Sequence, residues 1–292
     1  CWFPYSYIGS KIAIGKFDNK LLDSLKRSDT KKSLAYHINK SGFNAKKVSK
    51  KQIKFDVKNF KFFIEPHIEQ GPVLEKKKIP LGIVTGIRGS FRFRDALCKG
   101  EYLHSGATPY DYRKDTVVAV SNLVNEMNTF WRQQLQKRKD LVITFGQFFT
   151  DNKEHSFAKS SGLVNFCIDV RSNSKNTLEY TKKILFKKIK LIEKKTNTKF
   201  FLGKETNSEP ALMDKKLIKK FQIYSKMISI KFETMASGAG HDASVFANYG
   251  IPSIMLFIRN KNGSHNPKEY MSIKNFMEVF KVLKGSIQDN HL

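Results

Sequence analysis

The residues best suited to chemistry begin with a histidine that follows a strand-like stretch. His67 comes just after the apolar stretch 60–64 and just before the break Gly71-Pro72, so we expect its ring at the end of a strand. Scaffolds often present functional side chains at such positions. An imidazole there can bind zinc or manganese. Spacing alone also allows an ordinary hydrogen-bonded surface histidine.

A second histidine stands in a similar position near the other end of the chain. His265 lies in the run Gly263-Ser264-His265-Asn266-Pro267-Lys268-Glu269, a turn that follows the apolar strand-like stretch 254–258. Two histidines placed in this way could share one metal site, because neutral imidazoles are common metal ligands.

Two further side chains could contact a substrate. Small residues and a proline expose His104 in the segment 103–109, where its ring could donate a hydrogen bond to a substrate carbonyl. Arg171 ends the strand-like stretch 162–171, on the face opposite the apolar residues, and could bind a carboxylate through two hydrogen bonds. The alternatives are a plain loop histidine and a salt bridge between Arg171 and Asp169.

A glycine-rich turn, Ser237-Gly238-Ala239-Gly240-His241-Asp242, leads into a predicted helix. Backbone N–H groups in such a turn can bind an anion. No Walker-type lysine follows, and the glycine spacing of dinucleotide-binding turns is absent. His241 and Asp242 could act as a pair that positions a ligand.

The elements that position these residues indicate an α/β protein with an inserted module. Strands are predicted at 55–64, 81–85, 230–234 and 253–258, and helices at 33–38, 214–227, 243–248 and 272–287. Between them the patterns predict strand 95–103, helix 116–137 capped by Asp115, strands 141–149 and 162–171, helix 176–195 and strand 199–203. That inner order is typical of ferredoxin-like modules. We therefore predict one discontinuous domain at 1–87 and 208–292, and an inserted domain at 88–207.

Composition narrows the classes of function. The net charge of +27 would suit nucleic acid, but only nine of the 53 basic residues are arginine, and base and phosphate recognition favours arginine. We predict a lysine-rich solvated surface with weak polyanion binding and no specific nucleic-acid site. No run of 18 apolar residues is present, so no membrane span is predicted.

Three cysteines show no framework spacing. Cys1, Cys98 and Cys167 match neither a disulfide scaffold nor a zinc knuckle. We predict Cys98 and Cys167 as core residues of strands. A reducing, cytoplasmic setting follows from this usage.

In their order along the chain these motifs resemble the hydantoinase/carbamoylase family of dinuclear-metal amidohydrolases. The residues that carry the resemblance are Gly9–Gly15, His67–Glu75, His104–Asp115, Ser237–Ala243 and Ser264–Glu269. The resemblance implies a zinc-peptidase-like α/β catalytic domain, incomplete at its N-terminus, with an inserted ferredoxin-like α+β domain that acts as lid and dimerisation domain.

The resemblance also implies a role for each candidate. His67 would bind one of two divalent metal ions, zinc or manganese, and His265 the other. Gln70 would contact the substrate, a small ureide or N-carbamoyl compound, and His104 would polarise its scissile carbonyl. Arg171, helped by backbone at Gly240, would hold the substrate carboxylate. A homodimer through the lid domain is implied too.

Two departures from the family pattern matter. The family's other metal ligands and its general-base glutamate would lie before Cys1, and the chain lacks an initiator methionine, so we expect a piece of a longer protein or a processed product. The family's Asn-Val-Ile-Pro-Gly stands here as Ala158-Lys159-Ser160-Ser161-Gly162, which removes a substrate-binding asparagine.

The leading hypothesis is therefore a metal-dependent hydrolase of linear amidine or N-carbamoyl carbon–nitrogen bonds, similar to allantoate amidohydrolase. Within that class, N-carbamoyl-L-amino-acid hydrolase and β-ureidopropionase are the alternatives. A second hypothesis is a degenerate, non-catalytic remnant that acts as a dimerising or binding module. A third, motivated by charge alone, is nucleic-acid binding.

Overall fold

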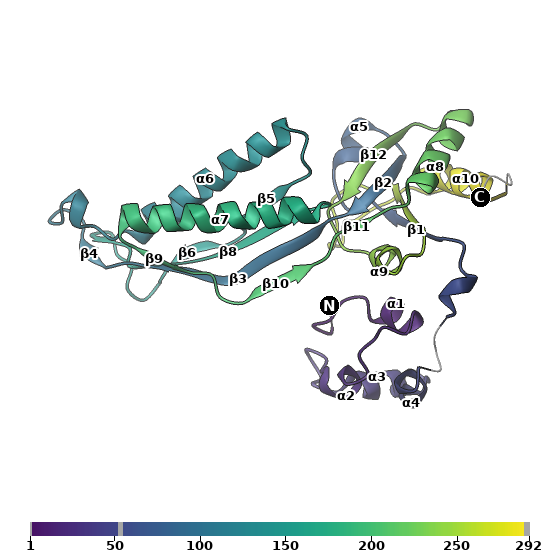
Figure 1. The fold of residues 1–292 in the computed structure, drawn as a ribbon, viewed down its shortest axis with the longest axis horizontal. Coiled ribbons are helices and arrows are strands. Elements are labelled where there is room, and N and C mark those ends of the chain that lie inside the picture. Colours follow the sequence, from purple (N-terminus) through teal and green to yellow (C-terminus); the bar gives the residue numbers. More distant parts are fainter. Residues whose placement is uncertain (1, 52–54, 289–292) are drawn as a thin grey trace. The chain divides into compact units, whose positions relative to one another are not determined.

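The computed structural model describes residues 2–51 and 55–288, which divide into two compact units (Figure 1). Unit 1 comprises Cys1–Ile87 with Ala211–Leu292, and unit 2 comprises Arg88–Pro210. Among the described residues no helix is both long enough and apolar enough to cross a membrane.

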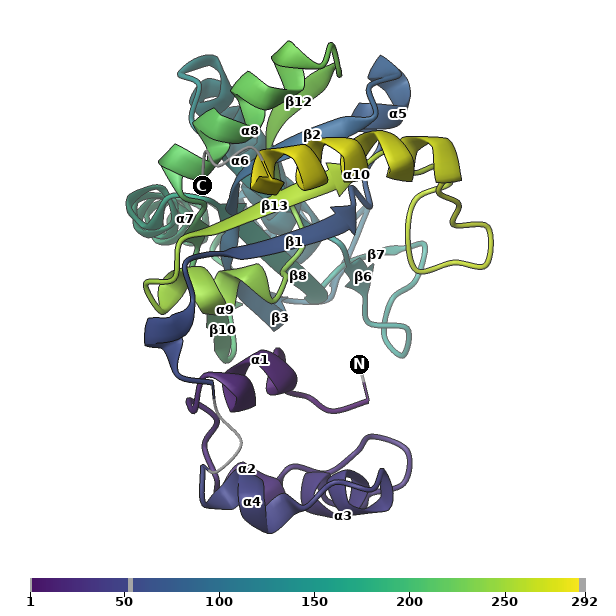
Figure 2. The same ribbon diagram turned by 90° about the vertical axis from the view of Figure 1, so that its right-hand side faces the viewer.

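A five-stranded mixed sheet forms the centre of unit 1. Its strands are β1 (Phe63–Ile68), β2 (Leu81–Ile87), β11 (Ala211–Leu212), β12 (Phe232–Ser237) and β13 (Ser253–Ile258). The order is β1-β13-β2-β11, and β12 also pairs with β2. β1 and β13 are parallel, with Phe63 opposite Ser253 and Ile68 opposite Ile258. The carboxyl ends of these two strands therefore reach the same edge of the sheet (Figure 2).

Helices cover both faces of this sheet. α8 (Lys215–Met227) and α10 (Ile273–Gln288) pack on one face, in a core that includes Ile254 and Leu256 of β13. The intervening side chains, Met255 and Phe257, point to the other face, where they meet α5 (Val73–Lys77) and α9 (Ala243–Asn248). Because successive side chains of a strand alternate between faces, the fully buried β13 can serve both cores at once.

The first 60 residues add short helices with a small core of their own. They are α1 (Ile8–Ala13), α2 (Leu21–Ser24), α3 (Leu34–Lys40), α4 (Ala45–Ser49) and the 3-10 turn η1 (Val57–Asn59). Phe17, Leu22, Leu25, Leu34 and Val48 are buried together. The predicted helix start at Ser33 is confirmed, because the Ser33 side chain caps α3 by accepting a hydrogen bond from the Tyr36 N–H.

Unit 2 contains a six-stranded antiparallel sheet. Its strands are β3 (Gly89–Lys99), β5 (Val142–Thr144), β6 (Phe148–Thr150), β8 (Leu163–Ser172), β9 (Lys199–Phe201) and β10 (Glu205–Ser208). The order is β10-β3-β8-β5, with β9 also on β3 and β6 also on β8. β4 (Leu103–His104) and β7 (Lys159–Ser160) pair as a separate two-stranded ribbon. The 3-10 turn η2 (Tyr110–Tyr112) follows β4.

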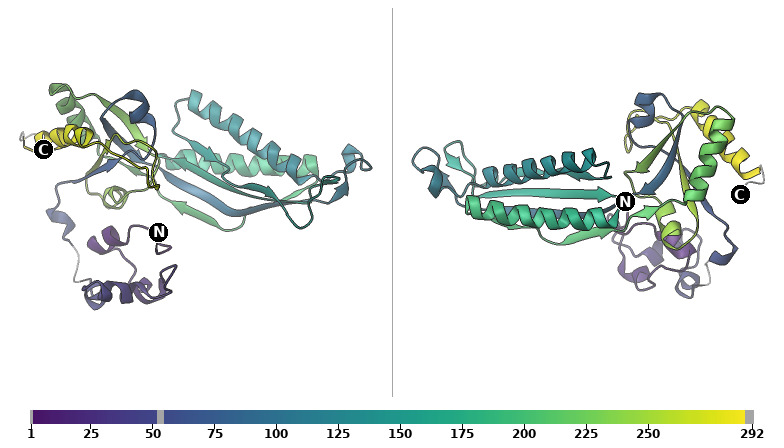
Figure 3. Two further views of the ribbon diagram at one scale, coloured as in Figure 1. Left: turned by 180° about the vertical axis from the view of Figure 1, so that it is seen from behind. Right: turned by 45° about the horizontal axis from the view of Figure 1, so that its top comes forward.

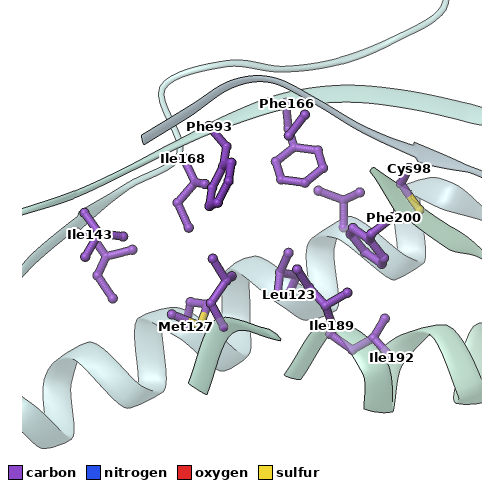
Figure 4. Packing of buried hydrophobic residues seen from close by; sticks show 14 of the residues in the cluster. Phe93, Cys98, Leu123, Met127, Ile143, Phe166, Ile168, Ile189, Ile192 and Phe200 are labelled. Atoms are coloured by element: carbon purple, nitrogen blue, oxygen red, sulfur yellow. The ribbon is translucent and has the colours of Figure 1, made fainter. Parts of the chain in front are cut away.

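Two long helices, α6 (Thr116–Gln136) and α7 (Lys175–Thr196), lie along one face of this sheet (Figure 3). Asp115 caps α6, as predicted, by accepting hydrogen bonds from the Val117 and Val118 N–H groups. The inward residues of β8 alternate as predicted. Leu123 and Met127 of α6 meet Phe166 and Ile168 of β8 in this core (Figure 4). The predicted order of strands and helices is present.

Several details of unit 2 differ from the prediction. The expected strand 95–103 is β3, which begins earlier, at Gly89, and ends at Lys99, and β10 was not predicted. The expected single strand 141–149 is two strands, β5 and β6, because the chain leaves the sheet between them; there the Gln147 carbonyl still accepts a hydrogen bond from the Cys167 N–H. Cys98 is buried, as predicted, whereas Cys167 is only half-buried. Burial raises the pKa of the Cys98 thiol to about 11, so this thiol stays protonated at neutral pH.

Leu123→Ala tests the core of unit 2. Leu123 is fully buried and Leu135 of the same helix is 48% exposed. Truncation of a buried leucine removes packing and leaves a cavity, so we expect unfolding free energy to fall by about 2–5 kcal/mol. The matched variant Leu135→Ala is expected to change it by less than about 0.5 kcal/mol. Equal losses in denaturant unfolding would contradict this packing.

Candidate active site

His67 and the loop that carries His265 meet at the carboxyl edge of the unit 1 sheet. His67 is the fifth of six residues in β1, and β13 ends at Ile258, seven residues before His265. The strand around His67 starts and ends later than the predicted strand 55–64, of which residues 57–59 form the turn η1 instead. His67 therefore lies inside the strand and not after it. The parallel pairing of β1 with β13 brings the two loops together.

One buried amide side chain ties these loops to each other. The Asn260 side chain, 1% exposed, accepts a hydrogen bond from the Gln70 N–H at 3.0 Å and donates one to the Gly263 carbonyl at 3.0 Å. Gln70 has a left-handed backbone with φ 61°, which is uncommon outside glycine. Asn260 therefore fixes both the Gln70 turn and the start of the loop that presents His265.

Gln70 in turn contacts the second histidine. Its side-chain amide nitrogen lies 2.9 Å from Ser264 Oγ and 3.5 Å from His265 Nε2. The Glu269 carboxylate accepts a hydrogen bond from the His265 N–H at 3.2 Å. A hydrogen bond from Ser264, together with the charges of His265 and His67, holds the pKa of Glu269 below its usual value. Both imidazoles therefore lie within electrostatic reach of one carboxylate.

Glu69, a residue to which the sequence assigned no role, holds the turn after His67. Its carboxylate is 8% exposed and accepts hydrogen bonds from the Val73 N–H at 2.8 Å and the Leu74 N–H at 2.7 Å. These are two of the unpaired N–H groups at the start of α5. A Cβ on Gly71 would lie 2.7 Å from Glu69 Oε1, so a larger residue there would displace this carboxylate. The only signal in the sequence is a glutamate just before a Gly-Pro break.

A buried group of polar side chains supports the His67 ring. His241 packs edge-on against His67 with ring centroids 4.5 Å apart. Its Nε2 lies 3.0 Å from Ser237 Oγ and its Nδ1 lies 3.7 Å from Glu65 Oε1. Burial, with a smaller contribution from His67, lowers the pKa of His241 to about 4, and burial raises the pKa of Glu65. His241 is thus a neutral support at pH 7, and its partners are Ser237 and Glu65.

The two candidate metal ligands fit a metal only in part. His67 Nδ1 lies 2.8 Å from the Ile68 carbonyl; donation to that carbonyl leaves Nε2 with a free lone pair, the form that metals bind. No group of three or more His, Cys, Asp or Glu side chains within residues 2–51 and 55–288 is arranged to hold a metal ion. A zinc site needs three or four ligands, so these residues alone do not complete one.

The glycine-rich turn between β12 and α9 is closely covered. The Tyr7 hydroxyl packs against Gly240 so tightly that any side chain there would collide with it. Ser10 donates a hydrogen bond to Asp242, and the Ala243 N–H donates to Glu65 at 2.7 Å. Asp242 therefore pairs with Ser10 and not with His241, and one of the N–H groups available to an anion is already used.

His104 ends β4 in unit 2 with its side chain exposed. Its Nδ1 accepts hydrogen bonds from the Gly106 N–H at 3.2 Å and the Ala107 N–H at 3.0 Å. Because Nδ1 is an acceptor, the neutral ring carries its proton on Nε2. The ring can therefore donate a hydrogen bond outward, as its predicted role requires. Lys159 of β7 lies directly opposite His104 in the ribbon.

Arg171 is paired with a carboxylate in unit 2. Its guanidinium lies 2.6 Å from Asp169 Oδ2, and Arg92 Nε lies 3.1 Å from Asp169 Oδ1. Burial would raise the pKa of Asp169, but its hydrogen bonds and the two arginine charges outweigh burial and lower that pKa. The salt bridge considered from the sequence is therefore present, and Arg171 stands half-buried.

His104 and Arg171 lie at opposite ends of the unit 2 sheet. Arg171 pairs with Ser90 near the start of β3, whereas β4 follows the end of β3 at Lys99. Nine residues of extended strand span about 30 Å. The structure thus brings His67, Gln70 and His265 together in unit 1, and keeps His104 far from Arg171 in unit 2.

Comparison with known proteins agrees with the motifs. Residues 39–289 match the family model for peptidase family M20/M25/M40. The chain is 34% identical over 237 residues to an N-carbamoyl-L-amino-acid amidohydrolase of a Pseudomonas species, covering 80% of this chain and 55% of that protein. It is 33% identical over 230 residues to an allantoate amidohydrolase of Escherichia coli, covering 77% and 53%. The chain thus spans little more than half of these relatives.

A solved structure shares the fold. A hydantoinase/carbamoylase family amidase from Burkholderia multivorans superimposes with a TM-score of 0.84 at 22% identity, covering 99% of this chain and 67% of that one. The predicted resemblance is confirmed by the family match and by the two named relatives, and the α/β fold class by the shared fold.

Asn260→Ala tests the tie between the two loops. The variant leaves the Gln70 N–H and the Gly263 carbonyl without their partner, so we expect unfolding free energy to fall by about 1–3 kcal/mol. The exposed Lys268, changed to alanine, is the matched control in the same loop. Histidine side-chain NMR signals of His265 should move in the Asn260 variant only. Unchanged stability and signals would show that the loops are fixed in another way.

Acidification tests the environment of His241. The pKa of His241 in the folded chain, about 4, lies below the usual value of 6.5. Between pH 4 and pH 6.5 this histidine therefore binds a proton in the unfolded chain but not in the folded chain. The stability contributed by His241 is complete above pH 6.5 and is lost as pH falls toward 4, by up to about 1.4 kcal/mol per pH unit. Denaturant unfolding at pH 7 and pH 5 measures it.

The control for this pH effect is His241→Gln, which should lose less stability between pH 7 and pH 5 than the unchanged chain. Glu65→Gln should lose more, because the raised pKa of Glu65 works in the opposite direction. The same loss in all three proteins would refute a buried, neutral His241.

Proposed function

Because the chain belongs to peptidase family M20/M25/M40, we propose that it acts as a metal-dependent hydrolase of linear amidine or N-carbamoyl carbon–nitrogen bonds. Allantoate is the leading substrate. One observation supports the proposal most: His67, Gln70 and His265 lie at the same edge of the sheet. Asn260 links the two loops there by its hydrogen bonds to Gln70 and Gly263. The catalytic domain of the proposal is unit 1, and unit 2 is its lid and dimerisation domain.

His67 and His265 are the proposed metal ligands, one for each of two zinc or manganese ions. Such ions supply a hydroxide nucleophile and polarise the bond under attack. Since the described residues offer these two imidazoles and no complete ligand set, we assign no reaction step to the ions. The buried His241 and the Ile68 carbonyl hold the His67 ring in the orientation that ligation needs.

The chain's own side chains bind and orient the substrate in this proposal. Gln70 donates an amide hydrogen bond to it, and Arg171 with the Gly240 backbone holds its carboxylate. To do so, the Arg171 guanidinium must share its donors between Asp169 and the substrate. His104 donates from Nε2 to the scissile carbonyl and stabilises the charge that develops there.

Two copies of the chain are needed for this arrangement. About 30 Å of strand separates the His104 end of β3 from the Arg171 end, whereas the carbonyl and carboxylate of a ureide lie only a few ångströms apart. One unit 2 cannot place both side chains on one substrate. We therefore propose a homodimer in which His104 of one copy serves the site of the other.

The proposed substrate is a small ureide that carries a negative charge. Allantoate and N-carbamoyl amino acids both carry the carboxylate that Arg171 would bind, and relatives bearing each activity in their names are 33% and 34% identical to this chain. We place the reaction in the cytoplasm.

Loss of either imidazole should abolish turnover. The test uses the protein expressed from its natural reading frame with zinc or manganese supplied, and measures ammonia release from allantoate, an N-carbamoyl-L-amino acid and β-ureidopropionate. His67→Ala and His265→Ala should each lower kcat/KM by more than about a hundredfold, since even the groups that merely support metal ligands cost 10–100-fold when removed.

His37 of α3, which is half-buried and lies outside the proposed site, is the matched control; changed to alanine, it should leave full activity. Ammonia release by His67→Ala at the unchanged rate would refute the proposal. A protein that dimerises but releases no ammonia from any of the three compounds would instead be the non-catalytic remnant.

A further inference from the structure

A second pocket lies in unit 1, away from the histidines. It has a volume of about 690 Å³ and is lined by residues of α8 and α10 and by those just before β1 and β13. Phe62 lies at the amino end of β1, whereas His67 lies near its carboxyl end, about 17 Å further along an extended strand. The pocket is thus at the opposite edge of the sheet, and its volume is in the range of small-molecule sites.

Positive charge gathers at this pocket. Lys61, Lys216, Lys219 and Lys220 line it, and Asp214 is the one acidic residue among its lining residues. The Asp214 carboxylate is already used, because it accepts the Leu217 N–H at 2.8 Å and caps α8. Within the described residues, the first three lysines form no ion pair. Their charge is therefore available to a ligand.

The α8 wall changes from charged to apolar along its length. Lys216, Lys220, Ile223 and Met227 follow one another at helical spacing, so they form one stripe facing the pocket. Ile223 and Met227 are 57% and 63% exposed, which is high for apolar side chains in a pocket wall. The stripe extends over about 16 Å of helix. A ligand that matched it would have a charged head and an apolar tail.

Inside the pocket one polar group has no partner. Ser286 of α10 lines the pocket, is fully buried, and its hydroxyl forms no hydrogen bond with any described residue. A helical serine usually bonds back to the preceding turn, and a buried hydroxyl without a partner costs free energy. A ligand atom able to accept a hydrogen bond would satisfy it.

We propose that this pocket binds an amphipathic anion, an unbranched apolar chain that ends in a carboxylate or phosphate head. Lys61, Lys216 and Lys219 neutralise the head. The Ser286 hydroxyl donates a hydrogen bond to it, and Ile223 and Met227 cover the tail. The two head groups share the same recognition chemistry, since lysine acts as a point charge on either. The site is independent of the hydrolase chemistry proposed above.

Calorimetric titration with dodecanoate and dodecyl phosphate, below their micelle concentrations, tests the proposal. At least one should bind with one site per chain, and the tighter of the two identifies the head group. Dodecan-1-ol, without the charge, and butyrate, without the tail, should bind at least tenfold more weakly, a difference of about 1.4 kcal/mol or more. Affinity should fall as salt is raised.

Paired variants locate the site. Lys216→Glu with Lys219→Glu should weaken dodecanoate binding about tenfold or more, and Ile223→Ser should weaken it as well. The matched control, Lys183→Glu with Lys187→Glu, makes the same charge change at exposed positions of α7 in unit 2 and should leave the affinity unchanged. A second measurement needs no variant: backbone amide hydrogen exchange in α8 of the unchanged chain should slow when dodecanoate is added.

The proposal is overturned if neither anion binds saturably, if dodecan-1-ol binds as tightly as dodecanoate, or if the α7 control weakens binding as much as the α8 pair. Protection of α7 in place of α8 in the exchange experiment would also overturn it.

Discussion

The carboxyl edge of the unit 1 sheet depends on one buried side chain, Asn260. Two loops leave parallel strands there, and Asn260 joins them by bonding to Gln70 on one side and Gly263 on the other. The Gln70 side chain adds a direct bond to Ser264. Both bonds lie in a nearly solvent-free position, where losing one partner is costly because the remaining group cannot turn to water. The neighbourhood of His67 and His265 follows from this tie.

Other buried side chains at this edge restrict the conformation of His67 and of the turn that follows it. Glu69 uses its buried carboxylate to fix the first turn of α5, which sets the direction of the chain after His67. His241 supports the His67 ring from behind and remains neutral because it is buried. Such support restricts a ring to one orientation. The arrangement suits an imidazole that must point its Nε2 lone pair at a fixed position.

Local patterns predicted the elements but not the contacts between them. The limits of α6 and α7 follow from apolar stripes and capping residues, and the alternation in β8 placed Arg171 opposite the core. The split between β5 and β6 was missed because a short apolar run does not show where pairing stops. The role of Asn260 could not be predicted either, since its bond to Gln70 joins residues 190 positions apart.

An anomalous diffraction map from crystals of the protein, expressed from its natural reading frame and grown with zinc, tests the central claim most directly. The account predicts two peaks about 3.5–4 Å apart, one within about 2.1 Å of a His67 ring nitrogen and the other equally close to His265. A map with no peak at these imidazoles, or with metal bound only elsewhere, would contradict the claim that this sheet edge is part of a dinuclear site.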